Sequence, residues 1–220
     1  MSIRQDIIDA CKKLEADGLN RGASGNVSVR DPESGGNDML ITPSAVAYDV
    51  IQPDQIARMS LTSDDFDWEG PKKPSSEWRF HRDILRARPD INAVVHTHAP
   101  WCTVLAVAHK PIPAIHYMIA AFGGADVWVC DYARYGTAEL SDNILKAMVG
   151  RNGCLMANHG MVVGGADLTR AMWLAGELEA LAHQYYHALT IGGGVVLSDA
   201  QITETAKGFE SYGVQSKDPT

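Results

Sequence analysis

The chain has 220 residues, of which 45% are hydrophobic, so it can bury one sizeable core, and we expect a single domain over residues 1–220. Its formal net charge is −8 and its lysines and arginines are scattered, which argues against nucleic acid or an anionic membrane surface as the main partner. The first residues carry charges throughout, and no later stretch approaches the roughly 20 consecutive apolar residues of a membrane-spanning helix. We therefore expect a cytoplasmic protein with no membrane partner.

The cysteines lie far apart in the sequence and form no C-x-x-C pair. This spacing favours buried apolar thiols in a reducing compartment over disulfides or zinc ligands. The four positions are Cys11, Cys102, Cys130 and Cys154.

The first part of the chain predicts a helix followed by a hairpin. Apolar residues recur with helical spacing over residues 7–14, which predicts an amphipathic helix that ends at Gly18. Residues 26–30 (NVSVR) and 38–42 (DMLIT) flank a turn-rich segment and are typical of a β-hairpin.

The middle of the chain predicts two helices with a strand between them. Residues 78–88 have a helical pattern that Pro89 stops. Residues 91–98 (INAVVHTH) predict a strand, and residues 102–110 predict the second helix.

Farther along, strand and helix patterns alternate again. Residues 126–132 predict a short strand, and apolar spacing over residues 140–148 predicts a helix. Residues 153–165 are apolar and predict a buried strand, or a pair of strands with a break at His159 and Gly160.

Two helices complete the predicted elements. Asp167 can cap a long helix that ends before the glycines at 192–194, and Ser198 with Gln201 forms a capping box for a last helix that reaches Gly213. The whole pattern predicts an α/β (α+β) domain with a central, mostly antiparallel or mixed β-sheet covered by helices on both sides.

Two histidines share one face of the strand predicted over residues 91–98. Because successive strand side chains point to opposite faces, His96 and His98 point the same way, about 6–7 Å apart, close enough to bind one ion. A catalytic zinc takes three protein ligands, and His159, in an otherwise apolar segment, is the candidate for the third. The alternative is that His96 and His98 are ordinary surface residues and His159 is a core histidine bonded to the backbone.

The other histidines include a competing pair. His183 and His187 are four residues apart on the predicted long helix and could share an ion. No carboxylate lies between them, and imidazoles near a helix end also suit the helix dipole, so this pair is the weaker candidate. Three histidines are left unassigned, or as candidates for residues that support a metal ligand without binding the metal: His81, His109 and His116.

Three segments rich in glycine and hydroxyl groups could together hold an anion. Residues 22–30 (GASGNVSVR) lack the spacing of a dinucleotide fingerprint and the lysine of a P-loop, but their backbone N–H groups can form an anion nest. Residues 42–45 (TPSA) and 74–77 (PSSE) add hydroxyl groups, the latter just before a predicted helix. The alternative is that all three are ordinary turns and caps.

Seven motifs follow one another in a characteristic order: GASGNVSVR, ITPSA, PSSEWRFH, VVHTH, AIHYMIAAFGG, DYARYGT and ANHG. Together they resemble the class II aldolase/adducin family, most closely its members that cleave L-fuculose 1-phosphate, and the resemblance covers nearly the whole chain. It implies a lyase that reversibly cleaves a ketose 1-phosphate, such as L-fuculose 1-phosphate, through a metal-stabilised enediolate. The implied products are dihydroxyacetone phosphate and an aldehyde such as L-lactaldehyde.

The resemblance also implies a metal site at the histidines. One Zn²⁺ per chain would be held by His96, His98 and His159, while Glu77 would bind the resting metal and then act as acid and base. The family is typically a homotetramer with active sites between subunits, in which Tyr117 would be a proton donor from a neighbouring subunit.

For the phosphorylated sugar, the resemblance implies a pocket at the three polar segments. Tyr135 and Tyr212 match positions near the aldehyde end of the substrate, although the family enzyme that cleaves L-fuculose 1-phosphate has a smaller aromatic residue in place of Tyr135. The family usually has glycine where this chain has Ala45, and alanine would strain a left-handed backbone there. The residues implied for the phosphate are Gly25, Asn26, Ser44, Ala45, Ser75 and Ser76.

The same resemblance is compatible with three other functions. A sugar-phosphate 4-epimerase usually has aspartate where this chain has Glu77, and a decarboxylase often has a basic residue in place of Ser76. A non-enzymatic, adducin-like interaction module would have no need of three histidines and a carboxylate. These features favour the aldolase.

Overall fold

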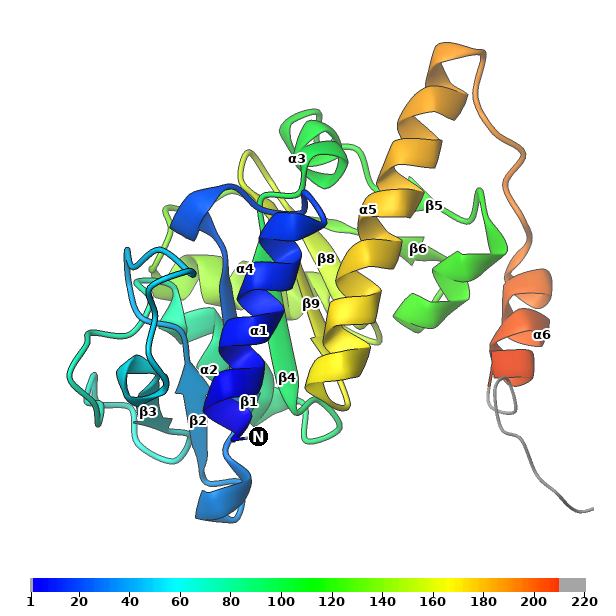
Figure 1. Cartoon of the computed structure of the whole chain (residues 1–220). Helices are drawn as coiled ribbons and strands as arrows, with labels where there is room; N and C mark the ends of the chain where they lie inside the picture. Colours follow the sequence, from blue (N-terminus) through cyan, green and yellow to red (C-terminus); the bar gives the residue numbers. More distant parts are fainter. Residues whose placement is uncertain (1, 210–220) are drawn as a thin grey trace, which may run out of the picture.

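A mixed β-sheet runs through the middle of the molecule (Figure 1). The computed structural model describes residues 2–209, and in that part of the chain the sheet has seven strands in the order β3-β2-β1-β4-β9-β8-β7. Neighbouring strands are antiparallel except β7 and β8, which are parallel. The strands are β1 (Asn26–Arg30), β2 (Asp38–Ile41), β3 (Ala57–Ser60), β4 (Ala93–Thr97), β7 (Val129–Cys130), β8 (Gly153–Met156) and β9 (Gly160–Gly165).

Helices cover both faces of the sheet, as the sequence predicted. On one face, α1 (Ile3–Ala16), α3 (Pro100–Val107) and α5 (Leu168–Thr190) pack in one apolar layer. On the other face, α2 (Trp78–Ala87) and α4 (Ala138–Ala147) pack in a second layer. The fold-class prediction is therefore confirmed.

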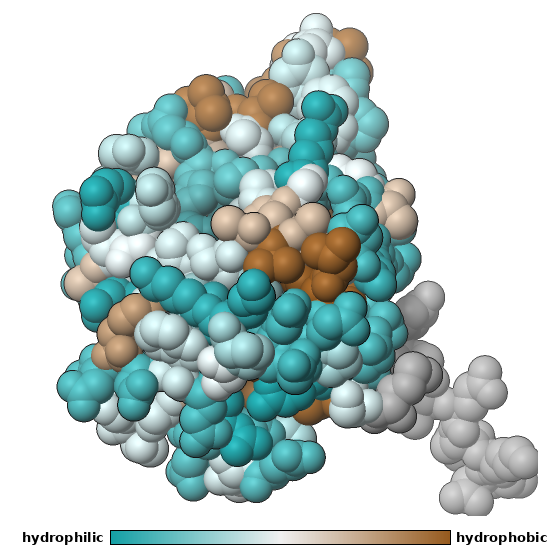
Figure 2. All heavy atoms as spheres, turned by 60° about the vertical axis from the view of Figure 1, so that its left-hand side comes forward, coloured by the Kyte–Doolittle hydropathy of each residue, from teal (hydrophilic) through white to brown (hydrophobic). Residues whose placement is uncertain are grey.

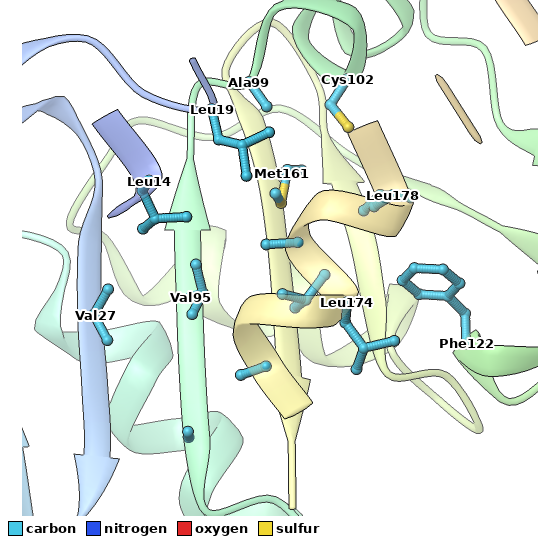
Figure 3. Packing of buried hydrophobic residues seen from close by; sticks show 14 of the residues in the cluster. Leu14, Leu19, Val27, Val95, Ala99, Cys102, Phe122, Met161, Leu174 and Leu178 are labelled. Atoms are coloured by element: carbon cyan, nitrogen blue, oxygen red, sulfur yellow. The ribbon is translucent and has the colours of Figure 1, made fainter. Parts of the chain in front are cut away.

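Each strand contributes side chains to both apolar layers, because successive side chains point to opposite faces of the sheet. On β4, Val95 belongs to the layer under α5, whereas its neighbour Val94 belongs to the layer under α2. Figure 3 shows Val95 of β4 and Leu174 and Leu178 of α5 in this same apolar layer, with the two leucines on the side of Phe122. The outer face near β3 is mostly hydrophilic, with a few separate apolar patches (Figure 2).

A smaller unit lies beside the main sheet. The strands β5 (Ile112–Pro113) and β6 (Asp126–Val127) pair with each other, and the 3₁₀ helix η4 (Tyr117–Phe122) joins them. The last helix, α6 (Asp199–Phe209), packs against η4. Three short 3₁₀ turns complete the elements of the described chain: η1 (Gly22–Ser24), η2 (Pro32–Ser34) and η3 (Pro53–Gln55).

Several predicted elements differ from the structure in their bounds. The strand predicted over 126–132 was wrong as one element, because it divides into β6 and β7, which belong to different sheets. The helix predicted from residue 102 begins at Pro100, whose missing N–H costs nothing in the first turn. Its next two amides, of Trp101 and Cys102, donate to the Glu179 carboxylate at 2.8 and 2.9 Å.

Other expectations match the structure. The Ser198 and Gln201 capping box is present, since the Gln201 amide donates to Ser198 Oγ and the Ser198 amide donates to Gln201 Oε1. The predicted end of that last helix at Gly213 lies outside the described residues. The four cysteines are buried and free. Within residues 2–209, no helix is long and apolar enough to cross a membrane.

Candidate metal centre and phosphate loops

Two neighbouring strand ends bring three histidines together. His96 is the fourth residue of β4 and His98 directly follows that strand, while His159 directly precedes β9, which pairs with β4. Their ligand nitrogens all lie within 4.8 Å of one another. The ring centroids are 5.1 Å apart for His96 and His98, and 4.8 and 4.9 Å from His159 to those two rings.

Gly160 makes this approach possible. A Cβ atom at that position would lie 2.4 Å from the carbonyl oxygen of Thr97 and 3.0 Å from the ring of His98. Any side chain there would push the start of β9 away from the end of β4. The glycine after His159 is therefore part of the geometry that gathers the histidines.

Backbone hydrogen bonding fixes the ring of His96. Its Nδ1 donates to the carbonyl of Met161 at 2.8 Å, so the neutral ring carries its lone pair on Nε2. This Nε2 and that of His98 are buried and have no hydrogen-bond partner among the described residues. Two buried ring nitrogens of this group are thus left without a hydrogen bond from the described protein.

A carboxylate closes the group from α2. Glu77 is the N-cap residue of that helix and is only 5% exposed. Its Oε2 lies 3.2 Å from Nε2 of His96, and its Oε1 lies 3.4 Å from Nε2 of His159. Asn26 Nδ2 donates to Oε2 at 3.0 Å, whereas Oε1 has no hydrogen-bond partner in the described chain.

Charge and burial set the protonation of these groups. Burial lowers the pKa of His98 and of His159 to about 4, so both rings are neutral at pH 7, as metal ligands must be. Burial alone would raise the pKa of Glu77, but His96 and His159 and the Asn26 amide hold it well below its usual range.

This donor set fits a divalent cation. Burial alone would lower the pKa of His96, but the Glu77 carboxylate beside it raises that pKa above its usual value, which favours a proton shared between these two groups. A divalent cation in place of that proton would satisfy the three imidazoles and the carboxylate together. Three protein nitrogens with one further, exchangeable position are the usual ligands of a catalytic zinc. Among the described residues, these histidines form the one group with such a spacing.

The segments at 42–45 and 74–77 lie against each other next to Glu77. The Ser44 amide donates to the carbonyl of Lys73, and the Ser75 amide donates to the carbonyl of Thr42, each at 2.9 Å. Ser75 Oγ accepts from the Glu77 amide at 3.2 Å. The two loops therefore present Ser44 and Ser75 side by side, close to the start of α2.

The glycine-rich segment lies against the end of β4. A Cβ atom at Gly25 would be 2.6 Å from the carbonyl oxygen of His96, and Asn26 is the register partner of His96 across β1 and β4. Tyr48 donates to the carbonyl of Gly25 at 2.7 Å and accepts from Asn20 at 2.8 Å. Sequence reasoning missed Tyr48 and Asn20, because no short-range pattern marks them.

Ala45 has a left-handed backbone, with φ of 56°. This conformation costs an alanine about 1–2 kcal/mol, which explains why glycine suits this position. The expected strain at Ala45 is thus present in the structure, directly after Ser44.

Two of the aromatic candidates, Tyr135 and Tyr117, are exposed and have different neighbours. Tyr135 is 60% exposed, and Gly136 beside it packs on the carbonyl of Ser76, so this loop borders the serine segment. Tyr117 is 49% exposed and contacts His116 and Phe209. Among the described residues, no interaction joins Tyr117 to the cluster of His96, His98 and His159. Tyr212 lies outside the described residues.

The competing histidine pair forms a different kind of cluster. The ring of His183 stacks on Trp101 at 4.3 Å, and the ring of His187 lies 4.7 Å from that of His183. Within the described chain, no third ligating side chain joins them. His81, which the sequence left unassigned or as a candidate to support a metal ligand, is buried and hydrogen-bonded to Asn26.

The chain is similar to characterised enzymes over almost its whole length. Residues 5–186 match the family model described as Class II Aldolase and Adducin N-terminal domain. The chain is 45% identical to 5-methylthioribulose-1-phosphate/5-deoxyribulose-1-phosphate aldolase of Rhodospirillum rubrum, an alignment that covers 100% of this chain and 96% of that protein. It is 42% identical to L-fuculose phosphate aldolase of Escherichia coli, with 97% and 96% covered. A solved structure of L-fuculose 1-phosphate aldolase matches with a TM-score of 0.89 at 40% identity, covering 94% of this chain and 95% of that one.

Proposed function

Because this chain belongs to the class II aldolase and adducin family and is a metal-dependent ketose-1-phosphate aldolase, we propose that zinc is its metal and a terminally deoxygenated ketose 1-phosphate its substrate. The observation that carries the proposal is the inward-facing set of His96, His98, His159 and Glu77. The products are dihydroxyacetone phosphate and a small aldehyde with an apolar end.

The substrate class follows from what similar enzymes share. The names of the relatives specify L-fuculose phosphate, 5-deoxyribulose 1-phosphate and 5-methylthioribulose 1-phosphate. In each of these sugars the end away from the phosphate carries a methyl or methylthio group instead of a hydroxyl. L-Fuculose 1-phosphate would release L-lactaldehyde, and the pentulose phosphates would release acetaldehyde or its methylthio derivative.

The residues divide the chemistry among them. When bound, zinc supplies Lewis acidity that stabilises the negative charge arising beside the carbonyl as the C3–C4 bond breaks. In the direction of bond formation, Glu77 removes a proton from the hydroxymethyl carbon of dihydroxyacetone phosphate. Tyr117 of a neighbouring subunit donates a proton to the aldehyde oxygen, and cleavage is the reverse of both transfers.

The phosphate is held by neutral donors instead of basic side chains. Ser44 and Ser75 lie side by side on paired loops, with Gly25 and Asn26 on the adjoining strand end. The exposed Ser76 extends this group toward Tyr135, which we assign to the aldehyde end together with Tyr212. Backbone N–H groups and hydroxyls of this kind bind an anion without a large net charge.

We further propose a cytoplasmic homotetramer in which residues 1–220 form one domain. The half-exposed Tyr117 supports shared active sites, because within residues 2–209 its ring contacts are with His116 and Phe209 and not with His96, His98 or His159. A tetrameric mass in light scattering is the expected result.

A substrate panel tests the proposed activity. Zinc-loaded protein is incubated separately with L-fuculose 1-phosphate, 5-deoxyribulose 1-phosphate and 5-methylthioribulose 1-phosphate, and dihydroxyacetone phosphate is measured with a coupled dehydrogenase. We expect release from at least one of them, and the reverse reaction with the matching aldehyde. No dihydroxyacetone phosphate from any of the three sugars, with zinc bound, would contradict the proposal.

A further inference from the structure

A row of buried polar side chains leads away from Glu77 into the protein. Asn26 on β1 donates to the Glu77 carboxylate at 3.0 Å. Behind it, Asn26 Oδ1 meets Nε2 of His81 on α2 at 2.5 Å, and Nδ1 of His81 meets Ser28 Oγ at 2.7 Å. Ser28 and His81 are fully buried and Asn26 is 4% exposed, so water does not substitute for these bonds.

The negative charge of Glu77 determines the direction of every bond in this row. An ionised carboxylate only accepts, so Asn26 must turn its amide nitrogen toward Glu77 and its oxygen toward His81. His81 must then carry its proton on Nε2, which leaves Nδ1 to accept from the Ser28 hydroxyl. Each group has one orientation that satisfies all of its neighbours.

His81 has the protonation that this arrangement requires. Burial lowers its pKa to about 3, so at pH 7 the ring is neutral, with one donor nitrogen and one acceptor nitrogen. The ring also stacks on Phe80 at a centroid distance of 4.7 Å, which holds its plane. A side chain without nitrogen would fill the same space but would leave the Asn26 amide free to rotate.

We propose that His81, together with Ser28, is a positioning residue that fixes the Asn26 amide and thereby holds the Glu77 carboxylate against the metal-binding histidines. This inference rests on the proposed function, because it concerns the proposed metal ligand Glu77. Without the row, Asn26 could present its oxygen to Glu77, and two acceptors would then repel each other. Groups hydrogen-bonded to a metal ligand commonly affect metal affinity about 10- to 100-fold.

The same row connects the metal site with the proposed phosphate site. An amide nitrogen has two hydrogens, and Glu77 accepts one of those on Asn26. The second hydrogen remains for a substrate oxygen, in keeping with the predicted phosphate role of Asn26. His81 therefore orients one side chain that serves both halves of the site.

The test is a double-mutant cycle on zinc affinity, measured by competition with a chromophoric chelator. The variants are His81→Phe, Asn26→Ala and the double variant, with Ser28→Ala as a milder change and His187→Phe as a matched surface control. We expect zinc binding to weaken about 10-fold in His81→Phe and in Asn26→Ala, and about 3-fold in Ser28→Ala. Because the His81 and Asn26 substitutions both act through Glu77, we expect zinc binding in the double variant to be weakened by no more than about 20-fold relative to the wild type.

Two results would overturn the inference. The first is zinc affinity in His81→Phe and Ser28→Ala equal to that of the wild type. The second is full additivity, about 100-fold in the double variant, which would indicate independent structural effects. Circular dichroism of the metal-free proteins checks folding, and Ser28→Ala keeps the test decisive if His81→Phe does not fold. Zinc affinity is measured without substrate. A failed cleavage assay would therefore contradict the proposed function, but the double-mutant cycle could still be interpreted.

Discussion

At the scale of single residues, three histidines and the Glu77 carboxylate form the centre of the candidate site. Strand alternation placed His96 and His98 on one side, and the apolar surroundings of His159 singled it out. Tyr48 and His81 could not be assigned in this way. Each makes its decisive hydrogen bond to a residue more than 20 positions away, and no local pattern records such a partner.

Glu77 allows the sharpest single-residue prediction. The change Glu77→Gln keeps the size of the side chain but removes its ability to take a proton. We expect exchange of the dihydroxyacetone phosphate hydroxymethyl proton with solvent deuterium to slow by about 100-fold or more, as followed by NMR. Glu69→Gln, on an exposed carboxylate, is the control and should exchange normally. Normal exchange in Glu77→Gln would exclude Glu77 as the base.

Ala45 permits a prediction about stability. Glycine at this position removes about 1–2 kcal/mol of left-handed strain from the folded state. It also gives the unfolded chain more conformational entropy, which lowers the free energy of unfolding by about 0.4–1 kcal/mol. We therefore expect Ala45→Gly to raise the free energy of unfolding, by less than about 1.5 kcal/mol, in urea denaturation. Ala47→Gly, two residues on and without a positive φ, should instead lower it. A lower free energy of unfolding in Ala45→Gly would contradict the inference that the backbone is strained at Ala45.

At the scale of elements, long periodic segments were predictable and short ones were not. The long helix α5 shows its apolar stripe in the sequence and is capped by Asp167, as predicted. The two-residue strands β6 and β7 are too short to show a period, so they merged into one predicted strand. The 3₁₀ helix η4 was missed for the same reason.

Helix α3 links the segments of two proposed metal ligands, His98 and His159. It starts two residues after His98, and beyond its other end Nε2 of His109 lies 2.7 Å from Oδ1 of Asn158, the residue before His159. Both His109 and Asn158 have left-handed backbones, with φ of 50° and 54°. The helix and this contact together hold the turn that presents His159.

The contact between His109 and Asn158 can be tested without touching a ligand. Asn158→Gly fits the left-handed backbone but loses the hydrogen bond, which is worth roughly 0.5–1.5 kcal/mol. We expect zinc affinity to fall about 5-fold in chelator competition if that energy holds His159 in place. Asn158→Asp keeps an acceptor for His109 and should bind zinc nearly as the wild type does. Unchanged affinity in Asn158→Gly would show that the turn is held without this bond.

At the scale of the whole molecule, the sequence predicted the layers but not the strand order. The apolar patterns indicated a sheet with helices on both faces, as observed. That β4 lies between β1 and β9 could not be predicted, because the pairing joins segments more than 60 residues apart. This pairing decides the site, since it places Asn26, His96 and His159 next to one another.

Metal removal should affect the whole fold as well as the activity. Without a cation, the buried acceptors of Glu77, His96 and His98 are left facing one another. A ligand present at 1,000 times its dissociation constant stabilises the folded state by about 4 kcal/mol. We therefore expect a chelator to abolish cleavage and to lower the thermal midpoint, and added zinc to restore both. Cleavage by metal-free protein would contradict the mechanism.

The two glycines that border the histidine strand also limit how this enzyme can be re-engineered. Gly25 and Gly160 each leave only enough room for a carbonyl oxygen of His96 or Thr97. Libraries that seek activity on bulkier aldehydes would gain nothing from variation at these two positions, since even a methyl group displaces the strand. The exposed Ser76 and Tyr135 lie outside that constraint. Under the proposed assignment of Tyr135 to the aldehyde end, new specificity is to be sought there while the histidine cluster keeps its shape.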